Sequence, residues 1–173
     1  PIKTWIEFLN RLLGVIAGLA TLLMMFFSIS YWKEKKILVL ISFSIVFGMA
    51  FQAWLGKLVV DSNLAPFKIT THMLMALVIV SLIVYSIFLI SKKENKIIIK
   101  GDFIKYLIVF SVIISLIQII VGTQVREFID VQYEILGADK KNLWLNNPNL
   151  YFYFHRSFSI LIFLINVLLF YLV

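Results

Sequence analysis

Residues 5–14 read Trp-Ile-Glu-Phe-Leu-Asn-Arg-Leu-Leu-Gly and open an apolar run that continues to Tyr31. A run of this length suffices for a helix that spans a bilayer, which needs roughly 20 residues. Near its start the run carries Glu7, Asn10 and Arg11. Ionisable side chains within a span are costly and usually face the interior of a helix bundle. The stretch therefore predicts a membrane span with a polar site near one end.

The composition of the chain also indicates a membrane protein. Of its 173 residues 62% are hydrophobic, whereas an average soluble domain has about 45–50%, and the mean hydropathy is +1.00. Cysteine is absent, which excludes disulfides and thiolate metal sites from this sequence. The net charge of +7 comes largely from lysines in short connections. It therefore indicates cytoplasmic loops and argues against nucleic acid as a partner.

Five apolar runs are each long enough to span a membrane, and they predict an all-α, polytopic transmembrane helix bundle. The runs are Trp5–Tyr31, Ile37–Val60, Ile69–Ile90, Phe103–Val125 and Leu150–Val173. The lysine-rich connections Trp32–Lys36 and Ser91–Lys105 are expected in the cytoplasm, because cytoplasmic loops are enriched in basic residues. Asp61–Lys68, Arg126–Asn149 and Pro1 are then expected on the outer side. Within the longer outer loop, residues 128–136 are expected to form a short interfacial helix.

Polar side chains of all five spans fall in one layer of this arrangement. They lie towards the outer ends of their spans, which predicts one shared cavity near the outer face. Besides the three polar residues of the first span, they are Gln52, Lys57, His72, Gln118, Gln124, Arg126, His155 and Arg156.

His72 and His155 are the only two histidines of the sequence. With no cysteine present, they are the natural ligands for a metal or a haem iron. Each also suits the alternative role of an interhelical hydrogen-bond donor. An apolar bundle would accommodate a haem ring, and Arg11, Arg156 or Lys68 would be able to pair with its propionates. The residues alone leave both roles open.

Glu7 and Arg11 are four residues apart and share one helix face. They are expected to form an intrahelical ion pair that makes burial tolerable. The functional alternative is that Glu7 serves as a proton acceptor in a dry site.

Two patterns occur twice in the sequence. Gln52-x-x-x-Gly56-x-x-Val59 recurs as Gln118-x-x-x-Gly122-x-x-Val125, and Asn10-Arg11 resembles His155-Arg156. Membrane proteins with repeated units often bind their ligands between the repeats. The patterns therefore indicate two related halves.

Taken in order, these motifs resemble the haem A synthase family. Glu7-Phe8-Leu9-Asn10-Arg11 is similar to the family's Glu-x-x-His-Arg signature, with Asn10 where the family usually has histidine. Gln52, Gly56 and Val59 with Asp61-Ser62-Asn63-Leu64 are similar to its second motif, with the serine one place later. His72 stands at the place of the first-half ligand. Gln118, Gly122, Val125 and Arg126, followed by His155-Arg156, resemble the opening of the second half.

The resemblance implies an enzyme that oxidises a methyl group of its substrate, haem O, to the formyl group of haem A for cytochrome oxidase. A second haem, haem b, would serve electron transfer. Glu7 would be the catalytic carboxylate, and His72 and His155 would ligate iron. The implied haem-binding residues are Asn10, Arg11, Gln52, Gln118, Arg126 and Arg156.

The family plan has eight spans in two four-helix halves, and this chain resembles spans two to six. Residues 1–90 would end the first half and residues 103–173 would begin the second, within one membrane domain. A fourth histidine is then expected beyond Val173. Since the sequence opens on Pro1 and stops within an apolar run, we expect a fragment of a longer protein.

The resemblance also implies the plasma membrane of a bacterium, with the haem site near the outer face. Its candidate partners are the lipid bilayer, haem O synthase, an electron donor such as a quinol, and further copies of the chain. Two alternatives stay open at this point. One is a non-catalytic haem-binding electron-transfer protein of the cytochrome b type, which Asn10 would suit, and the other is a transporter or structural bundle without haem.

Overall fold

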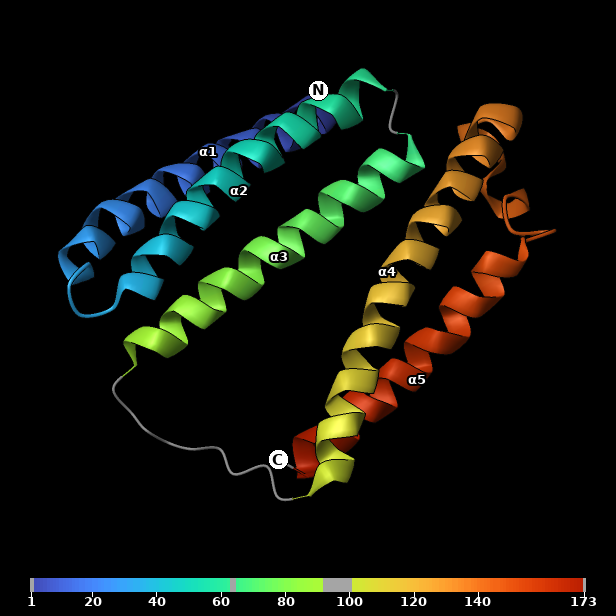
Figure 1. Ribbon diagram of the computed structural model, residues 1–173. Helices are drawn as coiled ribbons and strands as arrows, with labels where there is room; N and C mark the ends of the chain where they lie inside the picture. Colours follow the sequence, from blue (N-terminus) through green and yellow to red (C-terminus); the bar gives the residue numbers. More distant parts are fainter. Residues whose placement is uncertain (1, 63–64, 92–100, 173) are drawn as a thin grey trace. The chain divides into compact units, whose positions relative to one another are not determined.

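The computed structural model describes residues 2–62, 65–91 and 101–172, in which every regular element is helical. Five long helices follow one another (Figure 1): α1 (Ile2–Ser28), α2 (Lys36–Asp61), α3 (Pro66–Ile90), α4 (Asp102–Leu136) and α5 (Leu150–Leu172). The short 3-10 helices η1 (Ile29–Tyr31) and η2 (Ala138–Leu143) follow α1 and α4. The chain divides into two compact units, residues 1–94 and 95–173, and each is described by itself.

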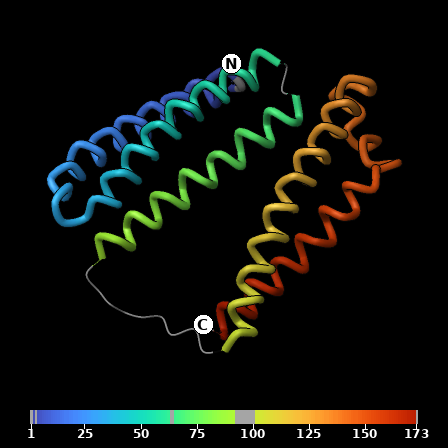
Figure 2. Tube along the Cα trace, in the orientation of Figure 1, coloured from blue at the N-terminus to red at the C-terminus, as the bar shows by residue number. Residues whose placement is uncertain are grey.

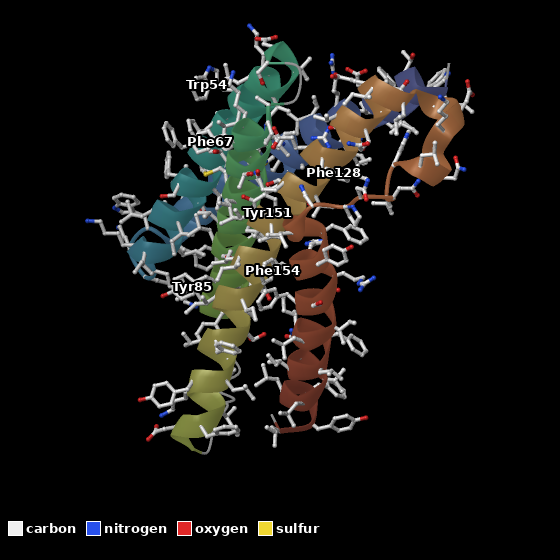
Figure 3. The ribbon with its side chains drawn as sticks, turned by 90° about the vertical axis from the view of Figure 1, so that its right-hand side faces the viewer. Trp54, Phe67, Tyr85, Phe128, Tyr151 and Phe154 are labelled. Atoms are coloured by element: carbon white, nitrogen blue, oxygen red, sulfur yellow. The ribbon has the colours of Figure 1, made fainter. Side chains whose placement is uncertain are left out.

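All five long helices have the length and apolar composition needed to cross a membrane. Many of their large apolar side chains point outward, and Trp54, Phe67 and Phe154 are each more than half exposed in the isolated chain (Figure 3). Such a surface is stable where lipid rather than water is the solvent. The predicted all-α, polytopic transmembrane bundle is thereby confirmed.

In the first unit, α2 packs against α1 on one side and α3 on the other (Figure 2). Leu38, Val39 and Ile45 of α2 are almost completely buried. Gly48 lets α3 come close, because a Cβ atom at this position would lie only 3.1 Å from Cγ1 of Ile79. Small residues at contact points allow such close packing of helices in lipid. The central helix of this unit is therefore α2.

In the second unit, α4 and α5 pack along each other as an antiparallel pair (Figure 1). The hydroxyl of Ser111 on α4 donates to Oδ1 of Asn166 on α5 at 3.3 Å. Near the loop that joins the two helices, the indole N–H of Trp144 donates to the carbonyl oxygen of Gly137 at 3.3 Å. The same indole meets the ring of Tyr133 edge-on. The first of these contacts joins α4 to α5, and the other two fasten the connecting loop at the end of α4.

The far end of α4 differs from the sequence prediction. A span ending at Val125 and a separate helix over residues 128–136 were expected, whereas α4 continues unbroken to Leu136. No glycine or proline interrupts residues 123–136, and Arg126 pairs with Asp130 one turn later at 3.3 Å, which favours the helix. Its 35 residues extend about 52 Å, whereas the hydrocarbon core is roughly 30 Å thick. The interfacial segment is therefore helical but belongs to α4.

Ile45 and Phe47 test this packing, because the first is 0% and the second 75% exposed although both lie on α2. Ile45→Ala should destabilise the protein by about 2–5 kcal/mol, since it removes buried methylene groups and leaves a cavity. Phe47→Ala, the control, should stay near wild type, because the lost atoms face lipid. The measurement is unfolding in mixed detergent micelles followed by circular dichroism. Equal losses in the two variants would contradict the packing.

Candidate functional site

The first predicted ligand, His72, is held by a glutamine of the neighbouring helix. Gln52 on α2 donates its side-chain Nε2–H to the backbone carbonyl of His72 on α3 at 3.1 Å. The same nitrogen lies 3.3 Å from Nε2 of the His72 ring. An amide carries two N–H groups, so Gln52 is able to serve both acceptors. If it does, the His72 ring accepts at Nε2 and carries its proton on Nδ1.

Gly56 receives the ring of this histidine. It follows Gln52 by four residues, which places both on one face of α2. A Cβ atom at Gly56 would lie 3.3 Å from Cε1 and 3.9 Å from Nδ1 of His72. Any larger residue would therefore crowd the imidazole. The face of α2 towards α3 thus offers a donor for the histidine backbone and a space for its ring.

The second predicted ligand, His155, lies in the same kind of contact. Gln118 on α4 donates its Nε2–H to the backbone carbonyl of His155 on α5 at 2.7 Å. A Cβ atom at Gly122 would lie 2.9 Å from Cε1, 3.4 Å from Nδ1 and 3.6 Å from Nε2 of the ring. We call this arrangement the Gln–Gly–His module: a glutamine, the glycine four residues later, and the histidine on the following helix. Each unit contains one.

The two modules leave the same polar atoms without a partner. Nδ1 of His72 and of His155, and Oε1 of Gln52 and of Gln118, are buried and have no hydrogen-bond partner within the described residues. Buried polar groups usually find a hydrogen-bond partner. Both units nevertheless leave the same two atoms unpaired, one on the histidine and one on the glutamine. In both histidines Nδ1 is the ring nitrogen that is buried without a partner, whereas Nε2 of His72 lies beside the Gln52 amide.

Glu7 and Arg11 form the intrahelical ion pair that their spacing predicts, with the Arg11 guanidinium bonded to Oε1 of Glu7. Both side chains are more than half exposed in the isolated chain, and Asn10 is exposed as well. Within the described residues α1 packs against α2 and η1. The structure therefore places Glu7 and His72 on helices that share α2 as their neighbour, without direct contact between them.

A groove of about 540 Å³ follows the contact between α1 and α2. Arg11 lies among its lining residues, together with Gly14 and Gly18 of α1 and Ala50 and Ala53 of α2. The small side chains leave room beside Arg11, while the rest of the lining is almost entirely apolar. The ion pair of α1 therefore borders a space that suits an apolar group.

The remaining two arginines have different surroundings. Arg126 is engaged by Asp130, whereas the exposed guanidinium of Arg156 lies 5.9 Å from the ring centroids of both Phe152 and Tyr153. Among the ion pairs of the described residues, Arg156 has no carboxylate partner. The charge of Arg156 is therefore available to an anionic ligand, and Arg156 directly follows His155 in the sequence.

No cluster of three or more histidine, cysteine, aspartate or glutamate residues that would hold a metal ion occurs in the described part of the chain. The single cavity predicted for all five spans would join residues of both units and stays a prediction.

Sequence reasoning missed the bond from each glutamine to the histidine backbone. The repeated Gln-x-x-x-Gly pattern was the available signal, because it places an amide donor one helical turn from a residue without a side chain. The pattern did not reveal which helix carries the carbonyl group that accepts from the glutamine.

Comparison with known proteins identifies the family. The family model COX15-CtaA, described as cytochrome oxidase assembly protein, matches residues 1–173. A curated relative named heme A synthase, from Wolbachia sp. subsp. Brugia malayi (strain TRS), is 30% identical over 125 residues. That match covers 68% of this chain and 37% of the relative, so the chain spans well under half of the relative's length. No solved structure gives a significant match. The chain therefore belongs to the cytochrome oxidase assembly family of COX15 and CtaA, which includes heme A synthase.

Proposed function

We propose that the protein is a haem A synthase-like membrane oxidoreductase, which converts a methyl group of haem O to the formyl group of haem A. The observation that carries this proposal is the Gln–Gly–His module, present once in each unit of a chain that belongs to this family. In each module a histidine ring lies at the contact of two apolar helices. That is the environment in which a haem with an apolar ring binds.

The residues present fit a haem. His72 and His155 would be the iron ligands, through Nε2, since their Nδ1 atoms are buried against α2 and α4. His155 would hold a resident haem b, and His72 would face the substrate haem O. When bound, haem b supplies one-electron transfer. Arg156 would pair with a propionate, because its charge has no carboxylate partner in the described residues.

The other predicted haem-binding residues take supporting roles in this proposal. Arg11 would interact with both Glu7 and a propionate, and Arg126 would interact with both Asp130 and a propionate. Asn10 would offer an amide to the substrate site. Gln52 and Gln118 contact the histidines.

Glu7 would accept the protons that the reaction releases. Conversion of a methyl to a formyl group replaces two hydrogen atoms with one oxygen atom. This is a four-electron oxidation, so it needs an external oxidant such as dioxygen, and a base near the methyl carbon would take up the protons of the broken C–H bonds. Arg11 compensates the negative charge of Glu7 in a membrane span. The groove beside Arg11 gives an apolar substrate a route to this carboxylate.

The proposed setting follows from the same family membership. The chain has helices suited to a multi-pass membrane protein, and we place it in a bacterial plasma membrane with the haem sites near the outer face. Haem O synthase, a quinol-type electron donor and further copies of the chain are the proposed partners. The units would belong to the two four-helix halves of the family plan.

One observation favours a second function. Asn10 stands where the family usually has histidine, and an amide is a poor iron ligand. A member without that ligand would suit a non-catalytic haem protein that only transfers electrons. Extraction of haem from cells that express the protein with haem O synthase separates the two functions, because electron transfer alone yields no haem A.

Glu7→Gln tests the catalytic carboxylate. The variant should lower haem A formation by about 10²–10⁴-fold, the usual contribution of a general base, because an amide accepts no proton. The absorption spectrum of haem b should stay unchanged, since the iron ligands are intact. The control is Glu127→Gln, which changes an exposed glutamate of α4 and should form haem A as wild type does. Wild-type haem A yield in Glu7→Gln would contradict the role.

His155→Ala tests the resident haem. The reduced-minus-oxidised absorption spectrum of the purified protein should lose its haem b signal, because the iron loses an axial ligand. Phe163→Ala is the matched control on α5, since this side chain is 66% exposed towards lipid. It should keep the signal. A haem b signal of wild-type size and shape in His155→Ala would exclude this histidine as the ligand.

A further inference from the structure

Resting on the proposed function, we propose that Gln52 and Gln118 are positioning residues for the haem ligands. Each holds its histidine by a hydrogen bond to the backbone carbonyl of that same residue. In this assignment the two glutamines do not bind haem themselves. They fix the place and the direction of the imidazole that does.

The first argument is the position of the hydrogen bond that the glutamine donates. A helical carbonyl already accepts one backbone N–H, and its second lone pair is free for another donor. In both units the glutamine uses the carbonyl of the histidine, not that of a neighbouring residue. Since the amide is part-buried between apolar helices, loss of this bond would leave the donor without a partner. In both units the histidine backbone is thus tied to the facing helix.

The second argument is the glycine. Each glutamine holds the histidine backbone, while the glycine one turn later receives the ring. Two contacts from one helix face define both the position and the direction of the side chain. Of the His72 ring, Cε1 and Nδ1 lie within 4 Å of the Gly56 Cβ position, and of the His155 ring Cε1 is nearest to the Gly122 Cβ position at 2.9 Å, with Nδ1 at 3.4 Å and Nε2 at 3.6 Å. In both modules the ring therefore turns Cε1 towards the glycine and holds Nδ1 closer to it than Nε2.

The third argument is the set of unpaired atoms. Ligand histidines usually donate their second ring N–H to a carbonyl or carboxylate oxygen, which fixes the tautomer. In each module, Nδ1 of the histidine and Oε1 of the glutamine are the buried atoms without a partner. The glutamine thus donates its Nε2–H to the histidine backbone, and its Oε1 is an acceptor of the kind that the Nδ1–H of the histidine needs.

The modules differ in one contact, and this decides which one to test. The amide nitrogen of Gln52 also lies 3.3 Å from Nε2 of His72, so it would have to leave that atom before iron binds. Removal of the Gln52 amide would loosen the His72 backbone but would also free Nε2 of the ring, and these two effects on haem binding oppose each other. Gln118 donates to the carbonyl of His155 alone in the described residues. The second module therefore gives the cleaner experiment.

The experiment measures the haem b of the whole protein in Gln118→Leu and Gln118→Met. Both variants lack the amide donor, and methionine keeps nearly the length of the glutamine side chain without any hydrogen-bond donor. Both should bind haem b about 10–100-fold more weakly, as loss of an outer-shell partner of a metal ligand does. The haem that remains should show a changed midpoint potential and a changed low-spin electron paramagnetic resonance signal.

Gln132→Leu is the matched control, because Gln132 lies on α4 fourteen residues beyond Gln118, a distance of about 21 Å along the helix. It should keep the affinity, potential and resonance signal of wild type. A space-filling role of Gln118 alone would let methionine restore all three, and that result would overturn the inference.

Gly122→Ala tests the same module while it keeps the hydrogen bond of Gln118. Its Cβ would meet Cε1 of His155 at 2.9 Å, so the ring has to move and the midpoint potential should shift. Gly48→Ala is its control, since its Cβ would meet Ile79 and Met75 at 3.1 and 3.2 Å but no histidine. It should leave the potential unchanged. This pair decides the question if Gln118→Leu fails to accumulate.

The outcomes separate the two proposals. Haem b in the wild type, with equal potentials in Gln118→Leu, Gly122→Ala and their controls, would overturn the positioning role and leave the proposed function intact. A wild-type protein without any haem would overturn the proposed function and this inference together.

Discussion

The structure depends on one constraint: a polar side chain within an apolar span needs a partner inside the protein. Lipid offers no hydrogen bonds, so a glutamine amide between helices has to bond to its neighbour. Gln52 and Gln118 meet this constraint by donating to the carbonyl of a histidine. The bond joins α2 to α3 and α4 to α5 at the histidine that we propose as the haem ligand. In this account helix packing and ligand placement are consequences of the same contact.

The occurrence of the module in both units supports a functional role for this contact. A single buried glutamine bonded to a helix would have an ordinary structural explanation. Here the glycine cradle, the histidine and the unpaired Nδ1 recur in two units with no sequence shared beyond a few positions. The first unit adds α1, whose Glu7–Arg11 pair borders a groove against α2. That unit thus carries a histidine and a carboxylate, which we propose as the substrate site, whereas the second carries a histidine and Arg156, which has no carboxylate partner in the described residues.

The sequence predicted the spans because the length and composition of an apolar run are sufficient to identify a membrane helix. It predicted the Glu7–Arg11 pair because partners four residues apart meet on any helix. It missed the extension of α4, since a helix leaving the lipid continues for as long as nothing interrupts it. It also missed the bond of Gln118 to His155, which are 37 residues apart, because pairing between helices depends on packing that no local spacing specifies.

The most direct test of this account is isotope-edited infrared spectroscopy of protein with ¹³C in the histidine carbonyls. The wild type should show labelled carbonyl bands at low wavenumber, because these oxygens accept a glutamine N–H besides the helical one. In a Gln52→Leu, Gln118→Leu double variant that remains helical, the bands should move to higher wavenumber. Bands unchanged from wild type in that variant would show that neither glutamine bonds to its histidine and would contradict the account.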